Sequence, residues 1–301
     1  MGATYENNRF KLIPVRPDWS DSSDLLGYKD LKNDFIKGPL TEMIIKATEN
    51  PDYPHFVVLD EMNLARVEYY LSDFLSVIES RSKQEDATIK TANIGNFKDG
   101  IPDNLYIIGT VNMDETTHPF SKKVLDRANT IEFNEVHLMN FSFLEEQPKV
   151  EPIVVSNKMF KSKYIHLKDA KAHIDLISKV SEQLEDINKI LATIYAQVGY
   201  RVRDEIAFYM SYNEEYQLLT RDEAMDFCIM QKILPRLSGA GGAFEDVLKE
   251  LFKFTIGPAV TMDIQAKGEL PSHTKYPRSA AKLREMHSRL RIQSFVSFWM
   301  S

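Results

Sequence analysis

The first half of the chain alternates between short, almost continuously apolar runs and stretches with helical spacing. Strands that are buried on both faces of a parallel sheet have this nearly unbroken apolar character. Between the runs, residues 39–47 and 66–79 repeat apolar side chains at helical intervals. The alternation predicts an α/β fold with a parallel sheet. The apolar runs cover residues 9–15, 55–60, 104–112 and 129–136.

The second half of the chain has helical periodicity only. Residues 169–195 carry apolar side chains at steps of three and four, which predicts a long amphipathic helix. Thr220 and Glu223 form a potential capping box before a helix that runs to about Leu234. Two more helices are expected after residue 242 and from Pro277. We therefore expect a partial nucleotide-hydrolysing α/β domain over 1–140, a helical lid over 141–262, and a basic helix with an aromatic tail over 263–301.

Composition excludes several classes of protein. The 301 residues contain a single cysteine, Cys228, so no internal disulfide can form. No apolar run is long enough to cross a bilayer, and the first residues lack a signal-peptide core. The formal net charge of −7 argues against a chain that coats nucleic acid over its whole surface. These features predict a cytoplasmic protein with no membrane partner.

The segment HFVVLDEMN (55–63) carries the first chemical signal. Its apolar residues predict a strand that delivers Asp60 and Glu61 to its carboxyl end. In open α/β sheets ligands bind at that edge. Asp60 can hold Mg²⁺, and Glu61 can polarise the water that attacks a γ-phosphate. The alternative is a buried strand that ends in an acidic turn, because this short pattern is common.

The run NLYIIGTVNMDE (104–115) places a second polar cluster after a strand. Asn112 can hydrogen-bond the attacking water without competing for the metal ion, and Asp114 and Glu115 follow it directly. Further along, Arg127 precedes another apolar run and can reach the γ-phosphate of a neighbouring subunit. The alternative for Arg127 is a helix-surface arginine that is paired with Asp126.

The motifs, taken in order, resemble the McrB-like branch of the AAA+ proteins. The resemblance covers most of the chain. It implies an AAA+ P-loop NTPase-type sheet followed by an α-helical lid. It departs from the commoner sensor-1 pattern at Met113 and Thr116–Thr117, which leaves the acidic partner in that motif open. The matching stretches are residues 17–28, 57–79, 107–133, 198–206 and 231–239.

The resemblance also implies roles for individual residues. Asp60 would bind Mg²⁺, Glu61 would be catalytic, and Asn112 would sense the γ-phosphate of GTP or ATP. Arg127 would act as an arginine finger in a neighbouring subunit, and Arg201 would be the sensor-2 arginine of the lid. Asp114 and Glu115 would complete the sensor-1 signature beside the nucleotide. Members of this family assemble into rings, recruit a McrC-like nuclease subunit, and meet DNA through other domains or subunits.

The phosphate-binding loop of the family does not occur in the sequence. No G-x-x-x-x-G-K-[ST] run is present in the 301 residues. In the resembled fold, the P-loop strand lies between the sensor-1 strand and the strand after Arg127. We therefore expect a sheet that lacks its central strand. Either the chain is a fragment, or a separate polypeptide supplies the missing unit, or the remaining strands rearrange. The glycine-rich stretch 238–242 is predicted to be a hinge or turn between helices.

Three functions are compatible with these patterns. The first is the GTP- or ATP-hydrolysing motor of a DNA restriction or phage-defence complex. The second is a nucleotide-incompetent AAA+-like module for assembly or regulation, which the missing P-loop favours. The third is nucleic-acid binding by the basic residues between Lys267 and Arg291, with stacking by the aromatic side chains that follow. Packing of those aromatic side chains against the lid is the plainer expectation. They are Phe295, Phe298 and Trp299.

Overall fold

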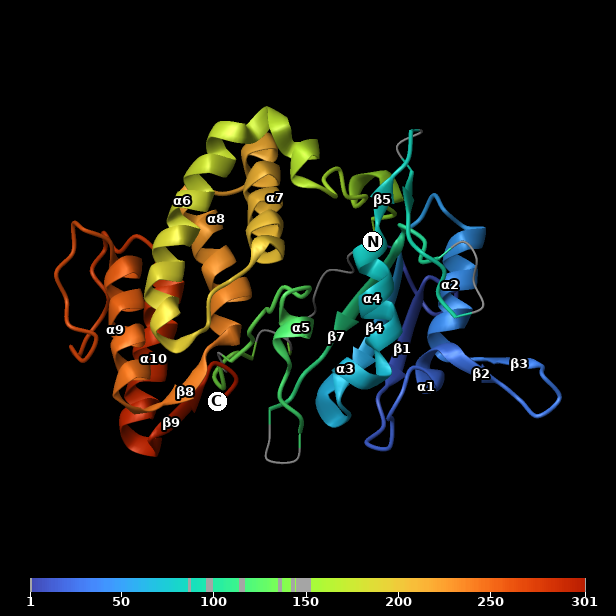
Figure 1. The fold of residues 1–301 in the computed structure, drawn as a ribbon, viewed down its shortest axis with the longest axis horizontal. Coiled ribbons are helices and arrows are strands. Elements are labelled where there is room, and N and C mark those ends of the chain that lie inside the picture. The colour runs from blue at the N-terminus through green and yellow to red at the C-terminus, as the bar shows by residue number, and fades with distance from the viewer. Residues whose placement is uncertain are drawn as a thin grey trace. The chain divides into compact units, whose positions relative to one another are not determined.

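The chain folds into two compact units, an α/β unit and a helical unit. The first consists of Met1–Val124 and Phe133–Ile165, and the second of Leu125–Glu132 and His166–Ser301. Figure 1 shows the ribbon of both. The computed structural model describes residues 2–85, 88–95, 100–113, 117–134, 137–141, 144 and 153–300.

A three-stranded parallel sheet organises the α/β unit. Its strands are β1 (Phe10–Pro14), β4 (His55–Asp60) and β7 (Leu105–Gly109), in the order β1-β4-β7. Val58 lies between Leu12 on β1 and Ile108 on β7. The predicted mixed α/β fold with a parallel sheet is confirmed at this level. Among the described residues, no strand pairs with the second edge of β7.

The two faces of the sheet are covered differently. Val57 and Leu59 point into the core of the unit, together with residues of helices α2 (Pro39–Glu49), α3 (Val67–Tyr70) and α4 (Ser72–Val77). On the other face, Phe56 stacks on Tyr106 with ring centroids 5.4 Å apart, and Phe160 lies edge-on to both rings. Ile108 on this face is 48% exposed. The alternating burial of β4 results from this difference between the faces.

Short elements connect the strands and helices of the α/β unit. A hairpin formed by β2 and β3, which the sequence patterns did not predict, projects from the unit between α1 and α2 (Figure 1). A second hairpin, formed by β5 and β6, follows α4 in the described part of the chain. The bounds of these elements are α1 (Ser23–Leu26), β2 (Gly27–Lys29), β3 (Phe35–Lys37), β5 (Ser82–Lys83) and β6 (Ile89–Lys90). Helix α5 spans Lys122–Leu125.

A buried polar cluster joins α2 to the amino-terminal ends of β4 and β7. The amide of Asn104 lies within 3.0 Å of the carbonyl oxygens of Ala47, Asn50 and Tyr53. The Nδ1 atom of His55 lies 3.0 Å from the Tyr53 carbonyl oxygen. His55 is buried, and this burial lowers the pKa of its imidazole. The positive charges of Arg9 and Lys46 lower it further.

The α/β unit is therefore expected to lose stability as the pH falls below about 6.5. Because the pKa of His55 is lower in the folded state, the unfolded chain takes up a proton first, and the free energy of unfolding falls. For one titrating group, the free energy of unfolding changes by at most about 1.4 kcal/mol per pH unit. Urea unfolding between pH 7.5 and 5.5, followed through the fluorescence of Trp19, measures it. His55→Gln should flatten the profile, whereas the same change at the exposed His273 should not.

The helical unit is built around four long helices. These are α6 (Ile174–Leu191), α7 (Tyr200–Tyr216), α9 (Gly241–Ile256) and α10 (Pro277–Gln293), and α10 packs against α9. The predicted amphipathic helix over 169–195 is confirmed as α6 with a short 3-10 turn at each end. None of the helices among the described residues is long and apolar enough to cross a membrane.

The predicted capping box is confirmed at the start of α8 (Arg221–Cys228). The Thr220 hydroxyl accepts a hydrogen bond from the Glu223 backbone N–H, and the Glu223 carboxylate accepts one from the Thr220 N–H. After α8 the chain continues as a π-helix over Ile229–Ile233 and a 3-10 turn over Leu234–Arg236. The two helices expected after residue 242 and from Pro277 are α9 and α10, and their apolar faces lie in the core of the unit. The residues concerned are Phe244, Val247, Leu248, Leu251, Ala280, Leu283 and Leu290.

The glycine-rich stretch 238–242 was predicted to be a hinge or turn between helices. It does connect two helical segments, but its first three residues form a strand and its last two begin a helix. Ser238–Ala240 form strand β8, which pairs antiparallel with β9 (Phe295–Ser297), and α9 begins at Gly241. A Cβ at Gly239 would lie 2.6 Å from the Phe244 ring, so glycine permits the strand to pass close to the helix. The strand was not predicted because its partner strand lies more than fifty residues away in sequence.

The predicted strand over 129–136 is also wrong for its described part, residues 129–134. No neighbouring strand is available to this run among the described residues. Its backbone and charged side chains bind the helical unit instead. The Thr130 N–H donates to the Gln231 carbonyl oxygen, and Glu132 forms an ion pair with Lys282. An extended apolar run needs a ladder partner to become a strand, and this partner is absent here.

Candidate functional site

Two carboxylates lie at the carboxyl end of β4. Asp60 ends the strand, and Glu61 follows it in a left-handed backbone conformation, with φ 49° and ψ 50°. This conformation is unfavourable for a residue with a Cβ atom and is often found at functional sites. Glu61 is exposed and Asp60 is half-buried. The turn therefore presents both side chains at the edge of the sheet where α/β proteins bind ligands.

Thr110 links the two carboxylate residues to the end of β7. Its hydroxyl donates a 2.7 Å hydrogen bond to Oδ1 of Asp60 and accepts a 2.9 Å hydrogen bond from the Glu61 backbone N–H. Its carbonyl oxygen accepts from the Met62 N–H. One side chain thus orients the Asp60 carboxylate and stabilises the strained turn at Glu61. The sequence patterns did not single out Thr110, although it lies two residues before Asn112 in the same run.

Asn112 reaches the same point from the segment that follows β7. Its amide nitrogen donates a hydrogen bond to Oε1 of Glu61 over 3.2 Å. Asn112 is exposed, as is Glu61, so a ligand can approach both side chains. The structure thus brings together three of the residues that were expected at the site, Asp60, Glu61 and Asn112. A water molecule near this pair would meet one amide donor and one carboxylate acceptor.

A buried layer beneath the site fixes the segment that bears Asn112. The amide nitrogen of Asn63, a fully buried residue, donates to the Asn112 carbonyl oxygen over 2.9 Å. The Tyr70 hydroxyl donates to the Met62 carbonyl oxygen, and burial raises the pKa of this phenol. A Cβ at Gly109 would collide with the Met62 thioether, so glycine allows β7 to pass close to this turn. Packing of this kind holds the site in one geometry.

The acidic residues at the end of β4 fit a magnesium ion only if phosphate supplies further ligands. No group of three histidine, cysteine, aspartate or glutamate residues in the described part of the chain could hold a metal ion. Mg²⁺ commonly uses one or two carboxylates and completes its shell with water and phosphate oxygens. Asp60 suits that arrangement. The further acidic candidates, Asp114 and Glu115, lie outside the described residues.

The two expected arginines both lie in the helical unit. Arg127 belongs to the segment Leu125–Glu132, and Arg201 is exposed in the first turn of α7. Burial, and then the positive charge of Arg201, lower the pKa of Arg127. Asp126, the alternative partner of Arg127, forms an ion pair with Arg236. Arg127 is therefore close enough to Arg201 for their charges to interact, a proximity that sequence spacing did not indicate.

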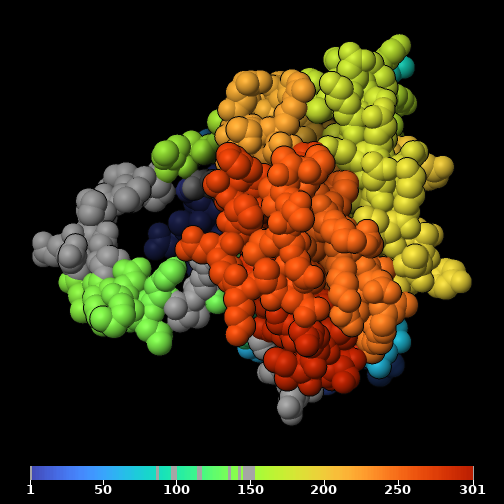
Figure 2. All heavy atoms as spheres, turned by 90° about the vertical axis from the view of Figure 1, so that its left-hand side faces the viewer, coloured from blue at the N-terminus to red at the C-terminus, as the bar shows by residue number. Residues whose placement is uncertain are grey.

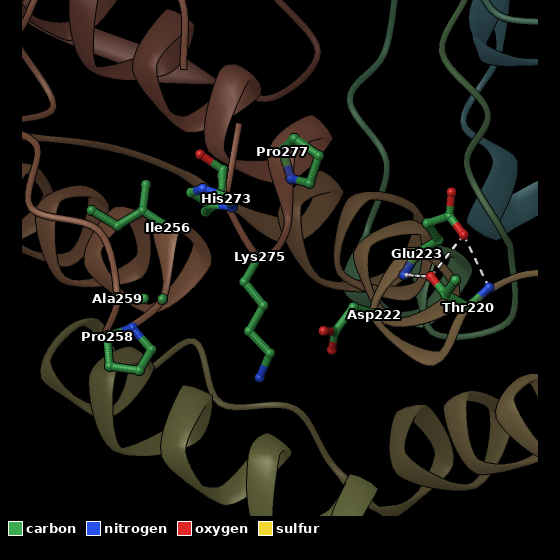
Figure 3. A pocket seen from close by; sticks show the side chains of 11 residues that line it. Thr220, Asp222, Glu223, Ile256, Pro258, Ala259, His273, Lys275 and Pro277 are labelled. Carbon is green, nitrogen blue, oxygen red and sulfur yellow. Dashed lines mark hydrogen bonds between the residues drawn. The ribbon is translucent and has the colours of Figure 1, made fainter. Parts of the chain in front are cut away.

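The helical unit carries a pocket that involves none of the expected site residues. Its volume is about 410 Å³, and its lining includes Asp222, His273 and Lys275 (Figure 3). Thr220 and Glu223 at its rim bond to each other within the capping box. Because the charged side chains of this pocket have mixed signs, it does not point to one class of ligand.

The basic tail is largely occupied by contacts within its own unit. The orange and red atoms of α9, α10 and the terminal residues form much of the surface in Figure 2. Arg284 donates to the carbonyl oxygens of Ala266 and Gly268, and Arg291 donates to Gln265. Phe298 is buried and the Trp299 indole donates to the Pro235 carbonyl oxygen, whereas Phe295 is 47% exposed. These contacts favour a packing role for the tail over nucleic-acid binding.

Comparison with known proteins adds a family match but no activity. The model of a domain of unknown function (DUF8727) matches residues 149–295, which cover most of the helical unit and the end of the α/β unit. The search of curated proteins found no match.

Proposed function

We propose that this chain is part of a Mg²⁺-dependent, nucleotide-hydrolysing motor of the AAA+ type. The observation that carries the proposal is the convergence of Asp60, Glu61 and Asn112 at the ends of two adjacent parallel strands, with Asn112 hydrogen-bonded to Glu61. Asp60 would bind the metal ion, Glu61 would polarise the attacking water, and Asn112 would orient it. The resemblance to McrB-like proteins adds the biological context of a DNA restriction or phage-defence complex with a nuclease partner.

The open edge of β7 supports an incomplete sheet. In the resembled fold, the P-loop strand would pair with this edge, and no described strand does so. We infer that the nucleotide's phosphates are held by a P-loop on a further polypeptide segment, because the 301 residues contain no such motif.

A non-enzymatic module for assembly or regulation is the second candidate. The absence of a P-loop motif favours it. The hydrogen bonds among Asp60, Thr110, Glu61 and Asn112 favour the motor, because a purely structural module does not need an exposed carboxylate in a left-handed turn.

Titration of the purified chain with Mg·GTP and Mg·ATP tests the proposal. If the chain is part of a motor, the chain alone should release no measurable phosphate. It should hydrolyse one of the two nucleotides when a P-loop-bearing strand and helix are joined to it or mixed with it. The reason is that Asp60 and Glu61 would bind the metal ion and polarise the attacking water, whereas neither binds the phosphates of the nucleotide. If the completed protein binds nucleotide and still releases no phosphate, the assembly module is correct.

A further inference from the structure

The segment that carries Arg127 belongs to a different unit from the chain on either side of it. Residues Leu125–Glu132 pack with the helical unit, whereas the residues before Leu125 and those from Phe133 to Ile165 pack with the α/β unit. An eight-residue segment that packs with a different unit from its neighbours needs specific contacts, because fixing its backbone has an entropic cost. Three buried cations of the helical unit provide them.

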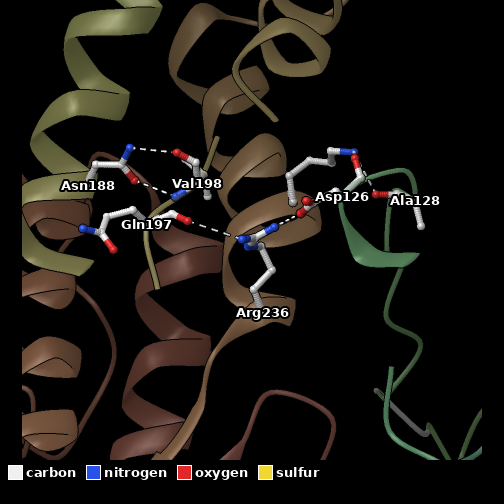
Figure 4. A network of polar contacts seen from close by, with 7 residues as sticks. Asp126, Ala128, Asn188, Gln197, Val198 and Arg236 are labelled. Carbon is white, nitrogen blue, oxygen red and sulfur yellow. Dashed lines mark hydrogen bonds and ion pairs between the residues drawn. The ribbon is translucent and has the colours of Figure 1, made fainter. Parts of the chain in front are cut away.

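The first cation is Arg236, whose side chain is 5% exposed. Its guanidinium forms an ion pair with the carboxylate of Asp126 and donates to the Gln197 carbonyl oxygen over 3.4 Å (Figure 4). Asp126 immediately precedes Arg127. The ion pair thus joins a buried guanidinium to a carboxylate that is 25% exposed.

The second cation is Lys232, whose side chain is almost fully buried at 3% exposure. Its ammonium group donates to the carbonyl oxygens of Asp126, over 3.2 Å, and of Ala128, over 2.9 Å. These carbonyls lie on the two sides of Arg127. Burial lowers the pKa of Lys232. The residue also lies in a π-helix, a distortion that is frequent at functional sites.

The third cation is Lys282 of α10, with 3% exposure of its side chain. Its ammonium group lies 2.5 Å from Glu132 and 3.3 Å from Glu285. The same group lies over the Phe298 ring, 4.7 Å from its centroid. Lys282 therefore holds the end of the segment, while Arg236 and Lys232 hold the part around Arg127.

We propose that Lys232, Arg236 and Lys282 are positioning residues that attach Arg127 to the helical unit, so that Arg127 and Arg201 approach a γ-phosphate as parts of one rigid body. The proposal rests on the proposed function, in which these arginines meet a nucleoside triphosphate. It departs from the expectation that the arginine finger belongs to the α/β part. Movement of the helices would then deliver both positive charges together.

Backbone hydrogen exchange of the full chain tests the attachment without any activity. In Lys232→Met and in Arg236→Met, the amides of residues 125–132 should exchange at least about ten times faster relative to those of α9 than in the parent chain. Lys189→Met on α6 removes an exposed lysine that is paired with Asp186, and should leave this ratio unchanged. The ratio corrects for general loosening of the helical unit. If it stays within about two-fold in both variants, the attachment is wrong.

Hydrolysis by the completed, P-loop-bearing protein tests the positioning role. Lys232→Met should lower kcat by about ten-fold or more and leave KM within about two-fold, because the arginine acts on transition-state charge. Adding Lys232→Met to Arg127→Ala should cause no further loss of kcat, because both substitutions remove the same contribution, that of a correctly placed Arg127. Independent, multiplicative losses would overturn the positioning role. If Glu61→Gln leaves hydrolysis intact, the proposed function fails, while the exchange result still decides the attachment.

Discussion

Replacement of Glu61 by glutamine should lower the hydrolysis rate of the P-loop-bearing protein by at least about 100-fold, within the usual range for loss of a general base. Glutamine keeps the size of the side chain and can still accept the hydrogen bond from Asn112, but it cannot polarise water as a carboxylate does. Nucleotide binding should stay within about two-fold of the parent, because Glu61 acts on the attacking water and not on the ground-state phosphates. Phosphate release and equilibrium binding of the same samples measure both quantities.

The matched control for this prediction is Glu49→Gln, the same change at an exposed residue at the end of α2. It should leave both hydrolysis and binding unchanged. Retention of full hydrolysis by Glu61→Gln would remove the catalytic role from this carboxylate. Parallel loss of hydrolysis and binding would instead indicate a binding residue.

Replacement of Asp226 by alanine should lower the free energy of unfolding of the helical unit by about 3 kcal/mol. Asp226 is fully buried on α8, and its carboxylate accepts hydrogen bonds from the backbone N–H groups of Arg278 and Ser279, each over 2.9 Å. The Ser279 hydroxyl donates a third, over 2.6 Å. These donors lie in the first turn of α10, whose own N-cap residue Tyr276 makes no side-chain cap. The variant would leave the buried Ser279 N–H and the part-buried Arg278 N–H without this acceptor.

Urea unfolding measures this change through Trp299, which lies in the helical unit, in a Trp19→Phe background. The control is Asp222→Ala on the same helix, where the side chain is exposed and a loss of no more than about 1 kcal/mol is expected. A loss below about 1 kcal/mol for Asp226→Ala would show that water or a rearranged side chain caps α10 in its place.

Local patterns in the sequence determined the elements that depend on neighbouring residues in the sequence or on an apolar face that any core can bury. The apolar runs at 55–60 and 104–112 predicted strands, and β4 and β7 occupy most of them. The expected burial on both faces is wrong for β7, where Ile108 is 48% exposed. The capping box at Thr220 and the helical periodicity of α6, α9 and α10 were confirmed, because caps and amphipathic faces depend on residues three or four positions apart. The run around Asp60 and the run around Asn112 each indicated a polar strand end. Parallel pairing brings such ends to one edge of a sheet.

Only the tertiary structure decided the contacts between distant segments. Thr110 could not be recognised as the link between Asp60 and Glu61, because its role depends on the register of β7 against β4. The strand β8 depends on a partner at Phe295–Ser297, and the run after Arg127 failed to form a strand because the helical unit binds it through Lys232 and Lys282. Sequence periodicity reports which face of an element is apolar. It does not report which buried cation, carbonyl or strand edge will meet that element, because such pairings are set by the packing of the whole chain.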